Sequence, residues 1–73
     1  MILTEKKDLA EIAEMIASRR KELCMSQSDV AKISGVDQAT ISYMESGKRI
    51  PTLMNLASVL GSLGMVIKIE KNT

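Results

Sequence analysis

A row of short polar and small side chains near the middle of the sequence is the feature best suited to contact another molecule. If this segment is helical, one face consists of Gln38, Ala39, Ser42, Tyr43 and Ser46. That face has no Lys, Glu or bulky aliphatic residue, whereas an ordinary solvent-facing helix surface usually carries charge. Amide and hydroxyl groups donate and accept hydrogen bonds, so the chemistry that this face offers is recognition.

The chain lacks most of the side chains that catalysis and metal binding usually require. The sequence has no His, one Cys (Cys24) and no glycine-rich phosphate loop. Glu11 and Glu14 lie about one turn apart on an expected helix without a third ligand, so an ordinary solvated face explains them. We therefore expect a protein that is not an enzyme and that holds no metal and no cofactor.

Two short helices and a tight turn, over residues 27–45, must position the recognition face. Ser26 and Asp29 have the spacing of a capping box at the start of the first helix. Gly35 stands where the chain must reverse, which favours a residue that adopts positive φ readily. Asp37 is an expected N-cap for the second helix. The side chains expected to face the core from these two helices are Val30, Ile33, Ile41 and Met44.

Two further amphipathic helices flank this pair. The first is expected over about residues 5–23, with an apolar stripe formed by Leu9, Ile12, Ala13, Ile16 and Leu23. The second follows Pro51, is capped by Thr52 and ends near Ser62. Its apolar stripe is expected to consist of Leu53, Leu56, Ala57, Leu60 and Leu63.

Residues 65–70 depart from helical spacing and alternate, with Ile67 and Ile69 against Lys68 and Glu70, which predicts a short strand. No other part of the sequence has a strand pattern, and a lone strand leaves its backbone N–H and C=O groups unpaired. We expect it to pair with the same strand of a second copy, antiparallel about a two-fold axis. The residues expected at this dimer contact are Val66, Ile67 and Ile69.

Length and composition fit one small helical domain over residues 1–73. Hydrophobic residues make up 45% of the chain but aromatic residues only 1%, so the core must be aliphatic and the expected fold is all-α, with four helices and the one C-terminal strand. The net charge of +1 points to no particular partner. The single Cys fits a reducing cytosol. We expect no signal peptide and no membrane span, hence a cytoplasmic protein.

The spacing Gln27-x-x-x-Ala31-x-x-x-Gly35-x-x-x-x-x-Ile41 resembles the helix-turn-helix of the lambda repressor and Cro family, also called the xenobiotic-response-element family of bacterial and phage regulators. The resemblance covers roughly residues 9–63, including the turn at 35–36, the Gln-Ala-Thr-Ile-Ser run at 38–42 and the exit at 45–51. Within the family, that run followed by a C-terminal strand is most similar to the HipB-type antitoxins. Those proteins are dimers that join through such a strand and bind a kinase-like toxin.

The resemblance implies that the second helix of the pair enters the major groove of double-stranded DNA, with its N-terminal residues on base edges. Gln38 is the expected reader of sequence, because a glutamine amide matches N6 and N7 of adenine. Ala39 could contact a thymine methyl group, and Ser42 could reach a base or a phosphate. Tyr43 completes the expected base-reading set, and two alternatives remain open for it: contact with the sugar-phosphate backbone, or shaping the rim of the contact.

The resemblance also implies contacts with the DNA backbone, which orient a protein without reading sequence. The family pattern places Gln27 at the start of the first helix of the pair, where it can hold a phosphate. Lys48 and Arg49 follow the recognition helix, although such residues are usually solvated charges. Thr40 has two open explanations, helix capping and backbone contact. Two further candidates are Ser46 and, from the cationic cluster at residues 19–21 (otherwise a solvated helix end), Arg19.

Two functions of different class remain open. The first is a sequence-specific repressor that acts as a homodimer on an inverted-repeat operator, regulates its own gene, and has half-sites about 10–10.5 base pairs apart. The second is an antitoxin whose main role is to neutralise a HipA-like kinase toxin, and both can be true of one protein. The HipB-type pattern has a longer tail that takes part in toxin contacts, whereas this sequence ends at Thr73, soon after the strand, which favours the repressor.

Overall fold

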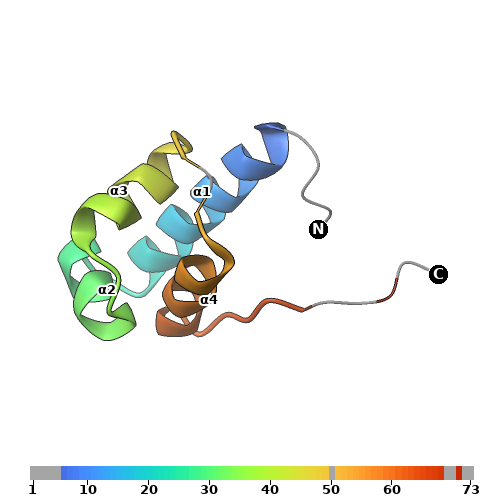
Figure 1. Ribbon diagram of the computed structural model, residues 1–73. Coiled ribbons are helices and arrows are strands. Elements are labelled where there is room, and N and C mark those ends of the chain that lie inside the picture. Colours follow the sequence, from blue (N-terminus) through green and yellow to red (C-terminus); the bar gives the residue numbers. More distant parts are fainter. Residues whose placement is uncertain (1–5, 50, 69–70, 72–73) are drawn as a thin grey trace.

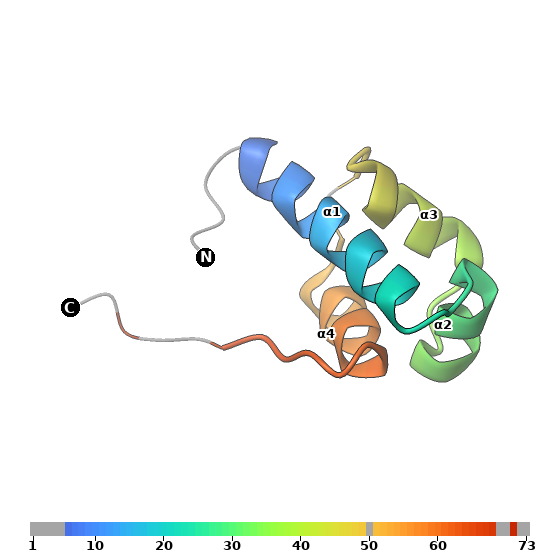
Figure 2. The same cartoon turned by 180° about the vertical axis from the view of Figure 1, so that it is seen from behind.

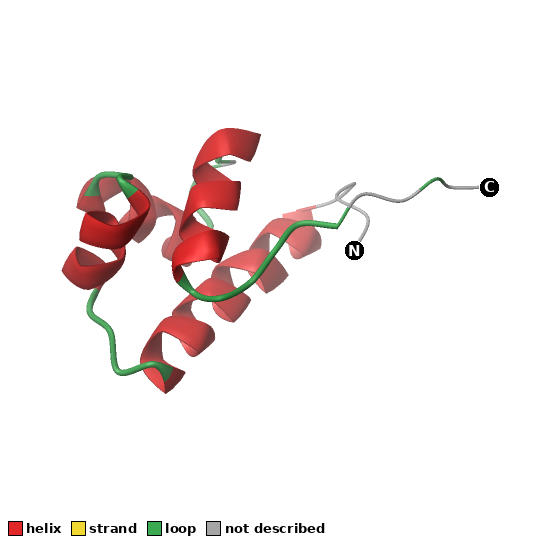
Figure 3. Ribbon diagram, turned by 90° about the horizontal axis from the view of Figure 1, so that it is seen from below, coloured by secondary structure: helices red, strands yellow, loops and turns green. Residues whose placement is uncertain are grey.

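A computed structural model describes residues 6–49, 51–68 and 71 of the chain (Figure 1). In order, its helices are α1 (Lys6–Glu22), α2 (Gln27–Ser34), α3 (Gln38–Ser46) and α4 (Leu53–Ser62). Within those described residues no strand is formed (Figure 3), which agrees with the expected all-α fold. None of the helices in the described part combines the length and the apolar character needed to cross a membrane.

The helices enclose one aliphatic core. α3 packs against α1 and α2, and α2 also packs against α4. Ile16 from α1, Val30 from α2, Ile41 from α3 and Val59 from α4 are all completely buried. A core without aromatic rings was expected from the composition. The remaining members of the buried cluster are Ile12, Val36, Met44, Leu56, Leu60 and Leu63.

Local sequence signals predicted the start and the end of α2 correctly. The Ser26 hydroxyl accepts a hydrogen bond from the Asp29 backbone N–H at 3.0 Å, and an Asp29 carboxylate oxygen accepts one from the Ser26 backbone N–H at 2.8 Å. Gly35 follows the helix with φ of 77°, and its N–H donates to the Ala31 carbonyl oxygen. The predicted capping box and the predicted left-handed turn are both confirmed.

The start of α3 differs in detail from the expectation. Asp37 occupies the N-cap position, but its side chain caps no backbone N–H and instead accepts a hydrogen bond from the Thr40 hydroxyl. At α4 the Thr52 hydroxyl accepts from the Asn55 backbone N–H at 3.1 Å, as predicted for an N-cap.

Several expected core residues lie on the surface. Ile33 is 65% exposed because the buried side of α2 is centred between Val30, Ala31 and Ser34, about a third of a turn away. Leu53 at the first position of α4 is 63% exposed. The core stripe of α4 is formed by Leu56, Val59 and Leu60, and the buried Leu63 directly after the helix continues it. Leu23 and Ala57, which were also expected in the core, are exposed.

The segment after α4 runs away from α2 and α3 (Figure 2). Met65 and Ile67 are half-buried and pack against the core, whereas Val66 between them is 87% exposed. This alternation fits an extended segment with one side on the core, but residues 65–68 make no sheet within the single chain. Ile69 and Glu70 lie outside the described residues. Pairing with a second copy therefore stays a prediction.

The capping box makes the stability of α2 dependent on pH. The hydrogen bond from the Ser26 backbone N–H, and secondarily the Ser26 side chain, hold the pKa of Asp29 below its ordinary value of 3.8. This contribution to folding is therefore complete above the ordinary value and is lost as the pH falls through the lowered one. We expect Asp29→Asn to be less stable than the wild type at neutral pH, with the difference closing in strong acid. Thermal unfolding followed by circular dichroism across this range would measure it, and a difference that stays constant with pH would contradict the assignment.

Candidate nucleic-acid interface

The outward face of α3 carries the residues expected to read bases. Gln38, Ala39 and Ser42 are exposed, and Tyr43 is 37% exposed. The opposite side of the helix is anchored because Ile41 and Met44 are buried in the core. The structure therefore brings the four expected base-reading residues together on one surface of a helix that is fixed from behind.

A largely buried ion pair connects α3 to the end of α1. The Arg20 guanidinium donates from Nε to Glu45 Oε2 at 2.7 Å and from Nη2 to Glu45 Oε1 at 2.9 Å. Its Nη1 donates to the carbonyl oxygen of Met25 at 2.9 Å, in the loop before α2. The side chains of Arg20 and Glu45 are only 13% and 8% exposed. One guanidinium thus joins α1, the entry to α2 and α3.

The electrostatics of this pair favour the charged form of Arg20. Hydrogen bonding to Glu45 raises the pKa of the Arg20 guanidinium above its ordinary value, and this outweighs the opposite effect of burial. Sequence analysis did not identify the pair. The available signal was Glu45 itself, the single charged residue in α3, together with the cations at the end of α1.

Gln27 belongs to the same network. Its side-chain amide donates to Glu45 Oε1 at 3.3 Å, and the residue is half-buried at the first position of α2. The expected phosphate contact of Gln27 is therefore combined with a contact inside the protein. Ser46 is also engaged, since its hydroxyl donates to the Tyr43 carbonyl oxygen at 3.0 Å.

Arg19 lies against the end of α4. Its Nε donates to the Leu63 carbonyl oxygen at 3.0 Å, and its Nη1 forms an ion pair with Glu22 at 3.0 Å. The structure therefore uses this guanidinium to attach α1 to the C-terminal end of α4. It does not bring Arg19 together with the outward face of α3, and the phosphate contact expected of Arg19 remains a prediction.

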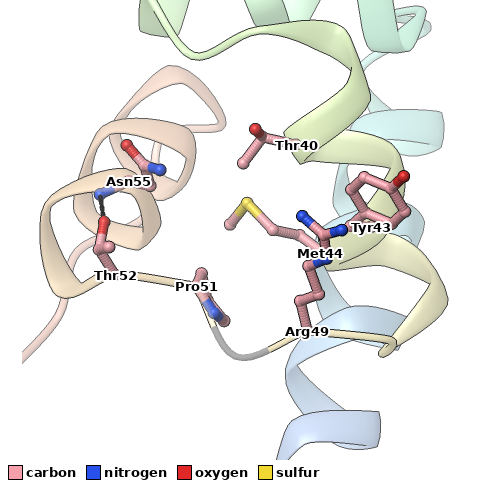
Figure 4. Close-up of a pocket in the computed structure, with 7 residues that line it drawn as sticks. All are labelled: Thr40, Tyr43, Met44, Arg49, Pro51, Thr52 and Asn55. Atoms are coloured by element: carbon pink, nitrogen blue, oxygen red, sulfur yellow. Dashed lines mark hydrogen bonds between the residues drawn. The ribbon is translucent and has the colours of Figure 1, made fainter.

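The turn after α3 carries the two cations expected near DNA. Gly47 ends the helix with φ of 70°, and Lys48 and Arg49 are exposed. The Arg49 guanidinium lies over the Tyr43 ring, 4.2 Å from the ring centroid. Beside them, a shallow pocket of about 200 Å³ separates the end of α3 from the start of α4 (Figure 4). Sequence analysis missed Asn55, which lines this pocket opposite Thr40.

The Arg20–Glu45 pair should be much more important for stability than the exposed pair formed by Arg19 and Glu22. Glu45→Gln leaves a largely buried guanidinium with a neutral partner, and we expect a loss of roughly 2–3 kcal/mol in the free energy of unfolding. Glu22→Gln is the matched control, because Glu22 is 65% exposed, and we expect a loss below about 0.5 kcal/mol. Denaturant unfolding would compare the two, and equal losses would contradict a special role for Glu45.

Comparison with known proteins agrees with this architecture. The sequence model of a family described as "Helix-turn-helix" matches residues 16–66, from the second half of α1 to the segment after α4. An "Uncharacterized HTH-type transcriptional regulator" from Haemophilus influenzae (strain ATCC 51907 / DSM 11121 / KW20 / Rd) is 38% identical over 61 residues. The matched region is 84% of this chain and 61% of that relative, which is therefore the longer protein.

Proposed function

The chain belongs to the helix-turn-helix family, and from this premise we propose that it is a sequence-specific DNA-binding regulator of transcription that reads bases with α3. The observation that carries the proposal is the outward face of α3, which is polar, exposed and free of charge while its opposite side is buried. The family matched points to DNA binding rather than to enzymatic activity. An α-helix with such a face fits the major groove of B-form DNA.

Three exposed residues of α3 receive a base-reading role from their chemistry. Gln38 at the first position of the helix can present its amide to N6 and N7 of adenine. Ala39 can contact a thymine methyl group, and Ser42, one turn after Gln38, can reach a neighbouring base or a phosphate. These residues belong to the N-terminal half of α3, which is the part that contacts bases in such motifs.

Backbone contacts would come from the residues that flank this face. Lys48 and Arg49 are exposed after the C-terminal end of α3, and Gln27 lies at the N-terminal end of α2, where backbone N–H groups favour an anion. Thr40 and Ser46 already donate their hydroxyl hydrogens within the protein, so each would contact phosphate as an acceptor of a water-mediated bond at most. The phosphate contact expected of Arg19 stays a prediction, and its guanidinium is already bound to the Leu63 carbonyl oxygen and to Glu22.

A repressor of this kind would act as a homodimer on an inverted repeat. The half-buried and exposed residues alternate from Met65 to Lys68, which supports an extended segment available for pairing with a second copy. Val66, Ile67 and Ile69 would form this contact. Two α3 helices related by a two-fold axis would then meet one face of the duplex, in half-sites about 10–10.5 base pairs apart. Binding within its own promoter would make the protein autoregulatory.

Exposed apolar residues favour a second candidate function, a protein-binding antitoxin of the HipB type. Leu53 and Met54 at the start of α4 are 63% and 79% exposed, and Val66 is 87% exposed. Such side chains suit a protein partner, here a kinase-like toxin, more than DNA. Co-purification with a kinase-like protein encoded beside this gene would support this candidate.

The direct test of the proposed function is selection of bound sequences from random duplex DNA at two salt concentrations, with wild type and Gln38→Ala in parallel. We expect the wild type to recover an inverted repeat with adenine at mirrored positions. Gln38→Ala should lose the preference at those positions and bind the selected site roughly 1–3 kcal/mol more weakly, with little change on random DNA. An equal loss on both kinds of DNA would make Gln38 a backbone contact, and no enrichment by the wild type would refute sequence-specific binding.

The dimer can be tested independently of DNA. Ile67→Pro removes a backbone donor from the expected ladder, so we expect sedimentation equilibrium to show the monomer where the wild type is a dimer. Ile67→Val keeps the donor and a β-branched side chain, and it should remain dimeric. If the proline variant were folded and still dimeric, the segment 65–70 would not be the interface.

A further inference from the structure

We propose that Tyr43 is a positioning residue that holds the guanidinium of Arg49 ready for a phosphate of the DNA backbone, and that it does not itself read a base. This inference rests on the proposed DNA binding and divides the labour within that same surface. It concerns the junction of α3 with α4, where a ring from the helix and a cation from the following turn lie in contact (Figure 4).

The turn after α3 builds the contact. The Lys48 backbone N–H donates to the Tyr43 carbonyl oxygen and the Gly47 N–H to the Met44 carbonyl oxygen, each at 3.3 Å. These bonds and the left-handed conformation of Gly47 reverse the chain directly after the helix. Arg49 is thereby returned to the side of Tyr43, with its guanidinium 4.2 Å from the ring centroid, a distance typical of a cation–π contact.

The stack of the Arg49 guanidinium on the Tyr43 ring leaves the charge of Arg49 available to a phosphate. Within the described part of the chain no carboxylate pairs with Arg49, whereas Arg19 and Arg20 are paired with Glu22 and Glu45. An aromatic face attracts a guanidinium without using its N–H donors, which lie in the plane of the group and can still bind phosphate oxygens. The ring therefore restricts where the cation lies and leaves its hydrogen-bonding edge open.

This restriction favours binding. A long side chain on a surface turn loses rotamer freedom when it is fixed against DNA, and a stack formed beforehand reduces that loss. The pocket beside the stack adds a polar partner, since Asn55 lines it from α4 opposite α3. A phosphate at the mouth of this pocket would lie within reach of both the Arg49 guanidinium and the Asn55 amide.

Base reading suits Tyr43 less well than positioning does. Tyr43 is in the C-terminal half of the nine-residue α3, whereas base contacts in such motifs come from the N-terminal residues of the recognition helix. The Arg49 guanidinium also lies over one face of the Tyr43 ring, whereas Gln38 and Ser42 are exposed.

The test is a double-mutant cycle on random-sequence duplex DNA, measured by fluorescence anisotropy at low salt. Tyr43→Leu should weaken binding by about two- to fivefold, the range that an exposed cation–π contact implies. In the Arg49→Ala background the same substitution should have no effect, because the residue that it positions is absent. Tyr43→Phe keeps the ring and should bind like the wild type. Lys48→Ala is the matched control, and its effect should add to that of Tyr43→Leu.

Three results would overturn the proposal while DNA binding stands. They are additive losses for Tyr43→Leu and Arg49→Ala, a loss for Tyr43→Leu that occurs on selected sequences and not on random DNA, and a loss for Tyr43→Phe equal to that for Tyr43→Leu. Thermal unfolding would verify that each variant folds, and Tyr43→Met would replace Tyr43→Leu in the cycle if the latter did not.

An NMR measurement on the protein without DNA distinguishes failure of this proposal from failure of the proposed function. NMR should show ring-current shifts of the Arg49 Cδ protons in the wild type and in Tyr43→Phe, and none in Tyr43→Leu. Absence of such shifts in the wild type would overturn the positioning role even if DNA binds. A wild type with these shifts that binds no duplex would refute the proposed function, and the inference with it.

Discussion

The position of the recognition face depends on the ion pair between Arg20 and Glu45. α2 and α3 have eight and nine residues, and helices of this length are marginal in isolation. Their mutual orientation must therefore come from contacts outside the two helices. Burial of the aliphatic core holds the helices together but is not directional, so it does not fix their mutual orientation. A bidentate guanidinium–carboxylate pair is directional. Because the same guanidinium also binds the Met25 carbonyl oxygen, the end of α1, the entry to α2 and the body of α3 are fixed by one group.

α3 serves three partners with nine residues, and this explains its composition. Ile41 and Met44 belong to the core, Glu45 belongs to the ion pair, and Gln38, Ala39 and Ser42 are left for DNA in the proposed function. The outward face contributes no residue to the core cluster, so the packing of the core does not determine which side chains it carries. In the proposed function, contact with DNA rather than folding accounts for the absence of charge on this face.

Sequence patterns predicted the local features of the fold and missed those that join distant parts. The capping box at Ser26, the reversal at Gly35 and the ends of the helices depend on neighbours within a few residues, which the sequence displays directly. The exposure of Ile33 in α2 and the burial of Val59 in α4 depend on which side of a short helix packs against the rest of the chain. Apolar residues spaced three and four positions apart are compatible with two such sides, so the sequence does not distinguish them. Arg20–Glu45 and Arg19–Leu63 join residues 25 and 44 positions apart. A strand at 65–70 requires a second chain, so a single chain neither forms nor excludes it.

The distribution of cations connects DNA binding with dimerisation. The net charge is only +1, and two arginines at the end of α1 are used within the protein, Arg20 on Glu45 and Arg19 on Glu22 and the end of α4. Affinity for DNA increases with the number of phosphates that cations neutralise, and Lys48 and Arg49 are the cations beside α3. One copy of the chain would therefore hold DNA weakly. Two copies joined by their C-terminal segments would double the phosphate contacts. The translational and rotational entropy of association would be lost only once for both copies. A regulator built on this surface would therefore gain affinity for DNA from the proposed dimerisation.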